Sequence, residues 1–258
     1  MKFSSKSEQI VSVQNLNLVY HVDHYTNKSI KDLFVSLASS PIKSLTASAR
    51  YYHVLQDINF DIYKGDRVGL LGINGAGKTS LCRCIAQMVV PNSGQVVVNG
   101  KTRAIFDTSI GIVPELTGRE NAEVICSLLY PELSHKERQE VIEESLEFSE
   151  LGEFLDVPYL KYSKGMQARL SLSIVSARGC DLLILDEVYD GADIFFREKV
   201  SARVLNMIKN SGAVIFVSHS LEQIEEACNK VVILDRSKVI YNGDVAQGIT
   251  IYKNLLRK

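Results

Sequence analysis

The sequence predicts an α/β fold with a parallel-sheet core, an antiparallel β subdomain and a helical subdomain. Three observations lead to this fold class. Two short apolar runs, Leu182–Leu185 and Ala213–Val217, have the character of strands buried on both faces of a parallel sheet. Alternating apolar residues before residue 65 and around residues 95–106 indicate antiparallel strands. Amphipathic stretches between residues 118 and 151 indicate helices.

Length and composition limit the function classes. The chain has 258 residues, 46% of them hydrophobic, and we expect a single domain over residues 1–258. A formal net charge of −1 gives no global basic field, so no nucleic-acid partner is expected. The five cysteines form no C-x-x-C pair, which argues against a zinc site or redox motif.

The sequence also bears on membrane association. The N-terminus is followed by no apolar block, so no secretory signal is predicted. The apolar runs are far shorter than the roughly 20 residues that span a bilayer. Any membrane role is therefore expected to go through a partner.

The first predicted elements are two strands on either side of a segment of different character. Gln9–Val22 alternates partly at period two and predicts a strand or hairpin arm. Leu55–Ile62 alternates and ends at a turn, which predicts a second strand. Between them, residues 24–50 carry apolar side chains at helical spacing until Pro41 and predict an inserted amphipathic helical element.

The inserted segment 24–50 has two readings. Its charged residues are mostly basic: Lys28, Lys31, Lys43 and Arg50, against Asp32. One reading is a short helix packed on the core with a solvated basic face. The other is a surface helix that faces anionic headgroups or a lipid-linked substrate.

A glycine-rich loop follows the next strand, which begins at Arg67. The sequence Gly72-x-x-x-x-Gly77-Lys78-Thr79 is a phosphate-binding P-loop, in which glycines with φ > 0 turn successive N–H groups around an anion. The following helix, expected from about Lys78, aims its N-terminus at the same phosphates. Lys78 would reach the β/γ oxygens of ATP, and the Thr79 hydroxyl would coordinate Mg²⁺. The predicted ATP-binding residues here are Gly72, Ile73, Asn74, Gly75, Ala76, Gly77, Lys78, Thr79 and Ser80.

After this helix, the sequence predicts a second hairpin and then the helical part. Gln95–Val98, the turn Asn99-Gly100 and a strand ending at Phe106 form the hairpin signal. A capping box, Ser134-x-x-Glu137, opens one of the later helices. The later elements are expected at Gly118–Tyr130, Ser134–Leu151, Leu182–Leu185, Ala213–Val217, Lys230–Asp235, Val239–Tyr241 and, as a C-terminal helix, 244–258.

Polar residues follow two of the apolar strands directly. Asp186 and Glu187 end the first, and His219 comes just after the second. Ligands of open parallel sheets bind at the carboxyl ends of the strands, so these residues should converge on the P-loop. We expect Asp186 to hold Mg²⁺ and Glu187 to act as general base toward the attacking water. A lone histidine such as His219 is more often structural, but a group at this position could contact the γ-phosphate and report its loss.

A further loop completes a set of motifs in fixed order. At Tyr162 to Gln167 the sequence resembles the ATP-binding cassette (ABC) ATPases, whose signature is a Ser-Gly-Gly-Gln-type loop at a helix start. The resemblance covers residues 9–243 and implies the ABC-type nucleotide-binding fold, ATP hydrolysis, and a Q-loop and helical subdomain over 107–178. It assigns the signature to Ser163, Lys164, Gly165, Met166 and Gln167, the Walker B strand to 182–187, the D-loop to Asp193 and the switch histidine to His219.

The signature departs from the common form, because Lys164 replaces a glycine and Met166 a glutamine. In the family this loop binds the γ-phosphate of ATP held by the opposite subunit, and an added lysine is electrostatically compatible with that role. The chain contains one P-loop and one signature, so the resemblance implies a head-to-tail homodimer.

Within the superfamily, four segments look like the ATPase subunits that export polysaccharides of the O-antigen, capsule and teichoic acid types. These segments are 114–121, 148–154, 162–166 and 186–193. The resemblance implies an integral-membrane permease partner, a lipid-linked glycan substrate and a peripheral location on the cytoplasmic face of the cell inner membrane. The insert 24–50 lies where that group carries an extra N-terminal element.

Two family positions are less regular. The usual Q-loop glutamine is absent, and Asp107 occupies its place by spacing, as a further candidate metal contact. Tyr20 fits the adenine-stacking position, with Tyr51 and Tyr52 as alternatives.

Two other functions stay open. One is an ABC exporter of another substrate. The other is a non-transport ABC ATPase acting on ribosomes or DNA, although such proteins carry two cassettes or long heptad coiled coils, which this sequence lacks.

Overall fold

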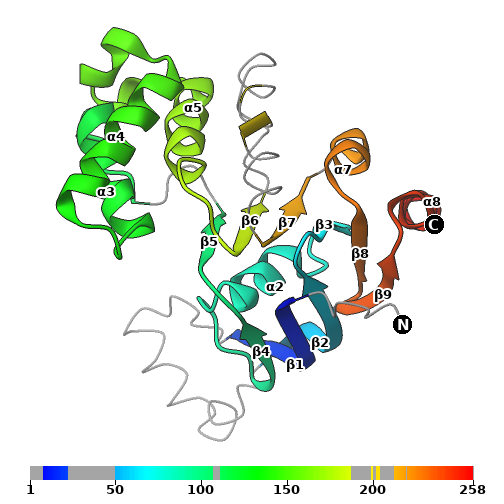
Figure 1. The fold of residues 1–258 in the computed structure, drawn as a ribbon. Coiled ribbons are helices and arrows are strands. Elements are labelled where there is room, and N and C mark those ends of the chain that lie inside the picture. The colour runs from blue at the N-terminus through cyan, green and yellow to red at the C-terminus, as the bar shows by residue number, and fades with distance from the viewer. Residues whose placement is uncertain are drawn as a thin grey trace, which may run out of the picture.

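The chain forms two sheets that share an apolar core, with a lobe of helices beside them (Figure 1). This computed structural model describes residues 8–22, 50–106, 111–186, 199, 202–203, 212–218 and 220–257. Within them, six strands form the main sheet in the order β5-β6-β7-β3-β8-β9, and β9 alone runs antiparallel to its neighbour. The strands are β3 (Arg67–Gly72), β5 (Thr102–Ile105), β6 (Leu182–Asp186), β7 (Ala213–Val217), β8 (Lys230–Asp235) and β9 (Lys238–Gly243).

The smaller sheet is antiparallel and has the order β2-β1-β4. Its strands are β1 (Gln9–Val22), β2 (Arg50–Tyr63) and β4 (Ser93–Val98). The two strands predicted before the P-loop are therefore confirmed, and they pair with each other. Their alternating residues, such as Val11 and Ile58, bury one face of this sheet in the shared core.

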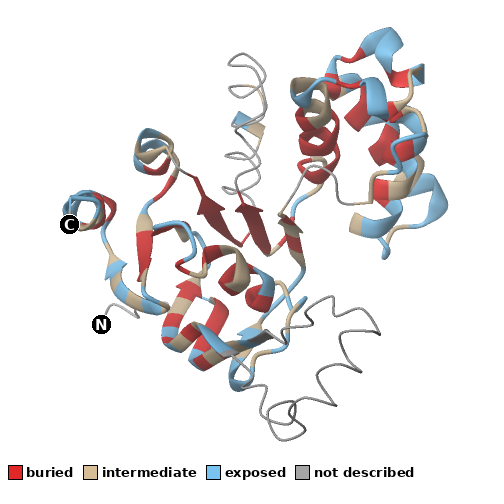
Figure 2. Cartoon of the chain, turned by 180° about the vertical axis from the view of Figure 1, so that it is seen from behind, coloured by how far each residue is buried: buried red, intermediate tan, exposed pale blue. Residues whose placement is uncertain are grey.

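Helix α2 (Lys78–Ile85) lies between the two sheets, where Leu81 and Ile85 are completely buried. It begins at Lys78, as expected, and ends before Met88, which is 61% exposed. Helices α7 (Leu221–Ala227) and α8 (Val245–Leu255) pack in the second core cluster with residues of the main sheet. In Figure 2 the parallel strands β6 and β7 are uniformly buried, as their all-apolar sequences predict.

The turn at Asn99-Gly100 does not form the predicted hairpin. Strand β4 before it pairs with β1, whereas β5 after it pairs in parallel with β6. The Asn99 side chain donates to the carbonyl of Gln9 at 2.9 Å, and the Lys101 N–H donates to the Asp181 carboxylate at 2.7 Å. Each end of the turn is thus hydrogen-bonded to a different sheet. The hairpin prediction was wrong because turn residues indicate that the chain reverses but not which strand it then pairs with.

The helical lobe contains α3 (Gly118–Leu129), α4 (His135–Ser149) and α5 (Lys164–Val175), with short 3-10 turns η2 (Gly152–Asp156) and η3 (Tyr159–Lys161). The predicted capping box is confirmed: the Ser134 hydroxyl accepts from the Glu137 N–H, and the Glu137 carboxylate accepts from Ser134. These hydrogen bonds lower the pKa of Glu137. A second capping box, Thr117 with Glu120, opens α3.

Two sequence expectations have different outcomes here. The five cysteines are all buried and free, and they pack as small apolar residues. The inserted element 24–50, apart from the strand backbone at Arg50, lies outside the described residues.

A single buried amide holds the segment that leads into α3. Asn121 is 0% exposed, and its Nδ2 donates to the carbonyls of Val113, Leu116 and Thr117 at 3.0, 3.1 and 3.0 Å. Its Oδ1 accepts from the Val113 N–H at 2.8 Å. The amide therefore adds to the few backbone hydrogen bonds of this irregular segment and supplies the partner of the Val113 N–H.

We predict that Asn121→Ala lowers the free energy of unfolding by about 1–3 kcal/mol, because it removes the partner of the Val113 N–H and one of the two hydrogen bonds of each of three carbonyls. Urea denaturation of the purified chain measures the change. Glu123→Ala, an exposed change on the same helix, is the matched control and should shift stability by less than about 0.5 kcal/mol. Equal stabilities for the two variants would contradict the role given to Asn121.

Candidate functional site

The P-loop joins β3 to α2 and passes very close to other strands. Gly77 precedes α2 with φ 102°, and a Cβ there would lie 2.7 Å from the carbonyl oxygen of Val54. Gly75 also has a positive φ, of 80°. A Cβ at Gly72 would lie 2.7 Å from the carbonyl oxygen of Leu234, so Gly72 is required for space and not for a positive φ.

The side chain of Lys78 lies across the loop. Its Nζ donates to the carbonyl of Gly72 at 2.8 Å and to that of Ile73 at 3.4 Å, and the residue is 9% exposed. The ammonium group is thereby held beside the backbone amides that would surround a phosphate. A charge fixed in this way needs little reorganisation when an anion binds.

An open cavity of about 480 Å³ lies over the loop. This volume falls within the usual range for small-molecule sites. The cavity is lined by Val54, Asn74, Gly75, Gly77, Lys78, Thr79 and Ser80. Six of these residues were predicted from the P-loop sequence. Val54 was not, because nothing in an alternating strand indicates that one residue will face a loop more than 20 positions later in the chain.

Asp186 lies at the carboxyl end of β6 and is 4% exposed. Both Asp186 and the P-loop lysine, Lys78, influence the thiol of Cys82 on α2. Burial and the Asp186 carboxylate raise the pKa of Cys82 well above its usual value, while Lys78 acts in the opposite direction. Asp186 and the P-loop lysine thus both act on the Cys82 thiol.

Ser218 follows β7 and connects the end of this strand to the start of α7. Its hydroxyl donates to Gln223 Oε1 at 2.8 Å and accepts from the Ser220 N–H at 3.0 Å. Sequence reasoning did not single out Ser218. Glu187, Asp193, His219 and Asp107 lie outside the described residues, so their roles stay predictions.

Helix α5 begins at Ser163, as predicted. The Ser163 hydroxyl accepts from the Met166 N–H at 3.2 Å and caps the helix, while Gln167 Nε2 donates to the carbonyl of Tyr162 at 3.4 Å. Ser163 and Lys164 are exposed, whereas Gly165 is half-buried. Figure 1 places α5, which Ser163 caps, in the helical lobe and away from α2, which follows the P-loop.

The exposed tyrosines gather on the β1–β2 arm. Tyr20 is 40% exposed and lies opposite Tyr52 across the two strands. Tyr51, opposite His21, is 59% exposed. Along the described part of the chain, the lining of the P-loop cavity includes Val54 but none of these rings. Which tyrosine contacts a base stays open.

Oxygen donors suited to Mg²⁺ are present at the site. Thr79 lines the cavity and Asp186 lies at the adjoining sheet edge, and a hydroxyl with a carboxylate fits the preference of Mg²⁺ for a few protein oxygens completed by water and phosphate. In the ranges that the structure covers, no group of three or more His, Cys, Asp or Glu side chains could hold a metal alone.

Comparison with known families decides the class of the protein. A family model described as ABC transporter matches residues 55–190, which include the P-loop, the Ser163 loop and β6. The chain belongs to the ABC transporter family. The predicted resemblance is thus confirmed, and with it the ABC-type ATPase class.

Relatives and solved structures extend the match over most of this ABC protein. The O-antigen export system ATP-binding protein RfbB of Klebsiella pneumoniae is 34% identical over 96% of this chain and 99% of its own length. The teichoic acids export ATP-binding protein TagH of Shouchella clausii is 31% identical over 80% of this chain and 57% of its own length. The ATP-binding cassette MJ0796, in a dimeric post-hydrolysis state with ADP and Pi, superposes with a TM-score of 0.71 at 19% identity, over 92% of this chain and 99% of that one.

These comparisons confirm the predicted fold class, an ABC nucleotide-binding domain with parallel core, antiparallel sheet and helical lobe. They also confirm the resemblance to polysaccharide-export ATPase subunits. None of the helices that the structure describes is long and apolar enough to cross a bilayer.

Gly77→Ala should weaken ATP binding by at least about tenfold, because the added Cβ meets the Val54 carbonyl and φ is positive. Gly65→Ala is the control: φ is 89° there too, but the space is open. It should cost about 1 kcal/mol of stability and leave ATP binding unchanged. Calorimetric titration measures the affinity. Wild-type affinity in Gly77→Ala would mean that the loop tolerates displacement from β2.

Proposed function

We propose that this chain is the ATP-hydrolysing subunit of a transporter that exports a lipid-linked polysaccharide of the O-antigen, capsule or teichoic acid type. The observation that carries this proposal is the reach of the match to RfbB, which covers 96% of this chain and 99% of the relative. The family model alone ends at residue 190. The likeness to an O-antigen export subunit therefore includes regions outside the shared ATPase motifs.

In the proposed mechanism, the P-loop amides and Lys78 bind the triphosphate of ATP. Glu187, next to the buried Asp186, orients the attacking water and takes its proton. Thr79 and Asp186 would hold Mg²⁺, with Asp107 as a further candidate, and the ion when bound neutralises phosphate charge. His219 would contact the γ-phosphate from the neighbouring strand end. Tyr20, or alternatively Tyr51 or Tyr52, would stack on the adenine.

A homodimer is needed to complete each site. The Ser163 loop lies in the helical lobe, away from the P-loop of its own chain (Figure 1). Two chains arranged head to tail would bring Ser163, Lys164 and the α5 N-terminus to the γ-phosphate on the partner, with Asp193 near the same contact. The helix N-terminus and the lysine both favour an anion there. Closure of the dimer would exclude water and assemble the catalytic groups together.

The proposed location is the cytoplasmic face of the inner membrane, where the chain would bind a separate integral-membrane permease. Closure and reopening of the dimer would move the permease, and the lipid-linked glycan would be its substrate. The insert 24–50 would face the membrane and the glycan. Residues 107–178, which include the helical lobe, would form the subdomain that moves relative to the core.

We expect Glu187→Gln to lower ATP turnover by about 100-fold or more, because the amide cannot accept the proton of the water. The variant should still bind ATP and accumulate as a dimer, which light scattering after gel filtration would detect. Lys78→Ala should weaken nucleotide binding and remain monomeric in ATP. Undiminished turnover in purified Glu187→Gln would remove the general-base role.

Export is tested by deleting the gene in its host. Undecorated lipid-linked polysaccharide should accumulate inside the cell and be lost from the surface, as measured by fractionation and glycan staining. A plasmid copy of the wild type should restore export, and a Lys78→Ala copy should not. Normal surface polysaccharide in the deletion strain would reject the assignment.

A further inference from the structure

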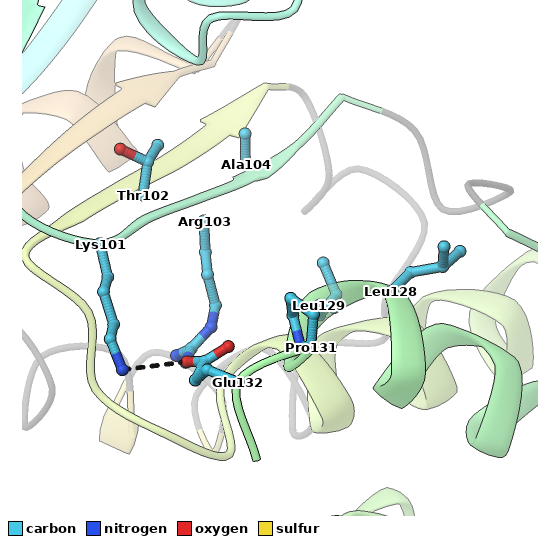
Figure 3. A pocket seen from close by; sticks show the side chains of 8 residues that line it. All are labelled: Lys101, Thr102, Arg103, Ala104, Leu128, Leu129, Pro131 and Glu132. Atoms are coloured by element: carbon cyan, nitrogen blue, oxygen red, sulfur yellow. Dashed lines mark hydrogen bonds and ion pairs between the residues drawn. The ribbon is translucent and has the colours of Figure 1, made fainter.

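The inference concerns Arg103, which crosses from the main sheet to the helical lobe. A pocket of about 400 Å³ separates β5 from the end of α3. Figure 3 shows the Arg103 side chain reaching from β5 toward Glu132, beyond the end of α3. The side chain is nevertheless only 5% exposed. A buried cation at the border of two parts of a fold requires specific partners.

The partners of Arg103 come from two elements of the lobe. Its Nη1 donates to the carbonyl of Arg178 and, at 3.0 Å, to that of Gly179, both just after α5. The guanidinium carbon lies 4.1 Å from the centroid of the Tyr130 ring, a cation–π contact. Its Nη2 lies 3.9 Å from Glu132 Oε1. The planar guanidinium thus binds two carbonyls and a ring face at once, and its rigid fork of donors fixes their relative positions more closely than the ammonium group of a lysine would.

Tyr130 extends this contact to the last turn of α5. The residue is 0% exposed, and its hydroxyl donates to the carbonyl of Ile174 at 2.6 Å. Arg103 and Tyr130 together therefore hold the C-terminal end of α5 and the loop that follows it. A positive charge at this end of a helix is favourable.

The opposite end of α5 carries the Ser163 loop. The helix has 12 residues and is about 18 Å long. One side packs in the lobe through Leu170 and Ile174, and another packs with residues of the main sheet through Leu172 and Val175. Apolar packing is not directional, so it fixes the angle of a helix less well than hydrogen bonds do. A tilt of about 10° at the Arg103 end would move Ser163 by about 3 Å.

We propose that Arg103 is a positioning residue for ATP hydrolysis: it fixes the angle of α5 against β5 and β6, so that Ser163 reaches the nucleotide held by the second chain. The inference rests on the proposed function, because it needs a site shared by two chains. Strand β6 pairs with β5 and ends at Asp186. Arg103 therefore links the side of the chain that carries Asp186 to the helix whose Ser163 would contact the nucleotide of the second chain.

The test compares Arg103→Met and Arg103→Lys with Lys101→Met. Lys101 contacts the same carboxylate, with Nζ 3.2 Å from Glu132 Oε1, but its side chain is 64% exposed. Both Arg103 variants should lower kcat for ATP by about 10- to 100-fold, since misplacement by an ångström or more has effects of that size. Their affinity for ADP should stay within about twofold of the wild type, because the P-loop is untouched. Lys101→Met should retain wild-type kcat.

Hydrogen exchange separates positioning from general destabilisation. In a folded Arg103 variant, amides of 163–167 should exchange faster while those of α2 keep their wild-type rates. A folded variant with wild-type kcat would overturn the inference, as would equal acceleration of exchange in α2 and α5. If Arg103→Met does not fold, Arg103→Lys decides by the same two measurements.

The Glu187→Gln background distinguishes this inference from the proposed function. Glu187→Gln should form the ATP-bound dimer, and the double variant with Arg103→Lys should form less of it. Equal amounts of dimer in the two proteins would reject the role of Arg103 but not the proposed function. Absence of a dimer in Glu187→Gln itself, together with no ATPase activity in the wild type, rejects the proposed function.

Discussion

The close approach of the P-loop backbone to two other strands is the constraint on which this structure depends. At Gly77 the loop touches the β2 backbone, and at Gly72 it touches the β8 backbone, with no room for a side chain at either point. The loop is thus held between the antiparallel sheet and the parallel sheet. Its amides are fixed before an anion binds, so binding does not carry the entropic cost of ordering them.

A second property of the fold is that it places the residues of the proposed site in two parts of the chain. Lys78 and Asp186 are buried beside the core of the sheets, whereas Ser163 begins a helix of the lobe, which has its own apolar cluster. Among the residues that the structure describes, α5 is the helix of the lobe that contributes buried side chains to both the lobe cluster and a sheet cluster, whereas α3 and α4 add only the partly buried Leu129 and Phe148 to the latter. The orientation of α5 would therefore set how the two halves of the proposed site meet.

Much of the fold could be predicted because short stretches of sequence determine its elements. Examples are the all-apolar runs of β6 and β7, the capping box at Ser134 and the P-loop. The hairpin predicted at the Asn99-Gly100 turn was wrong, because strand pairing depends on which distant strand has a free edge. Asn121 and Arg103 gave no signal for a similar reason. A buried amide or guanidinium acquires its function from carbonyls that only the folded chain brings near.

The position of Cys82 has a chemical consequence for the durability of the site. This thiol lies in the centre of the core, completely buried and under the influence of the Asp186 carboxylate. Alkylating agents and peroxides react with the thiolate, and here the neutral form is strongly favoured. The Cys82 thiol, one helix turn after the P-loop, should therefore react slowly with electrophiles and oxidants.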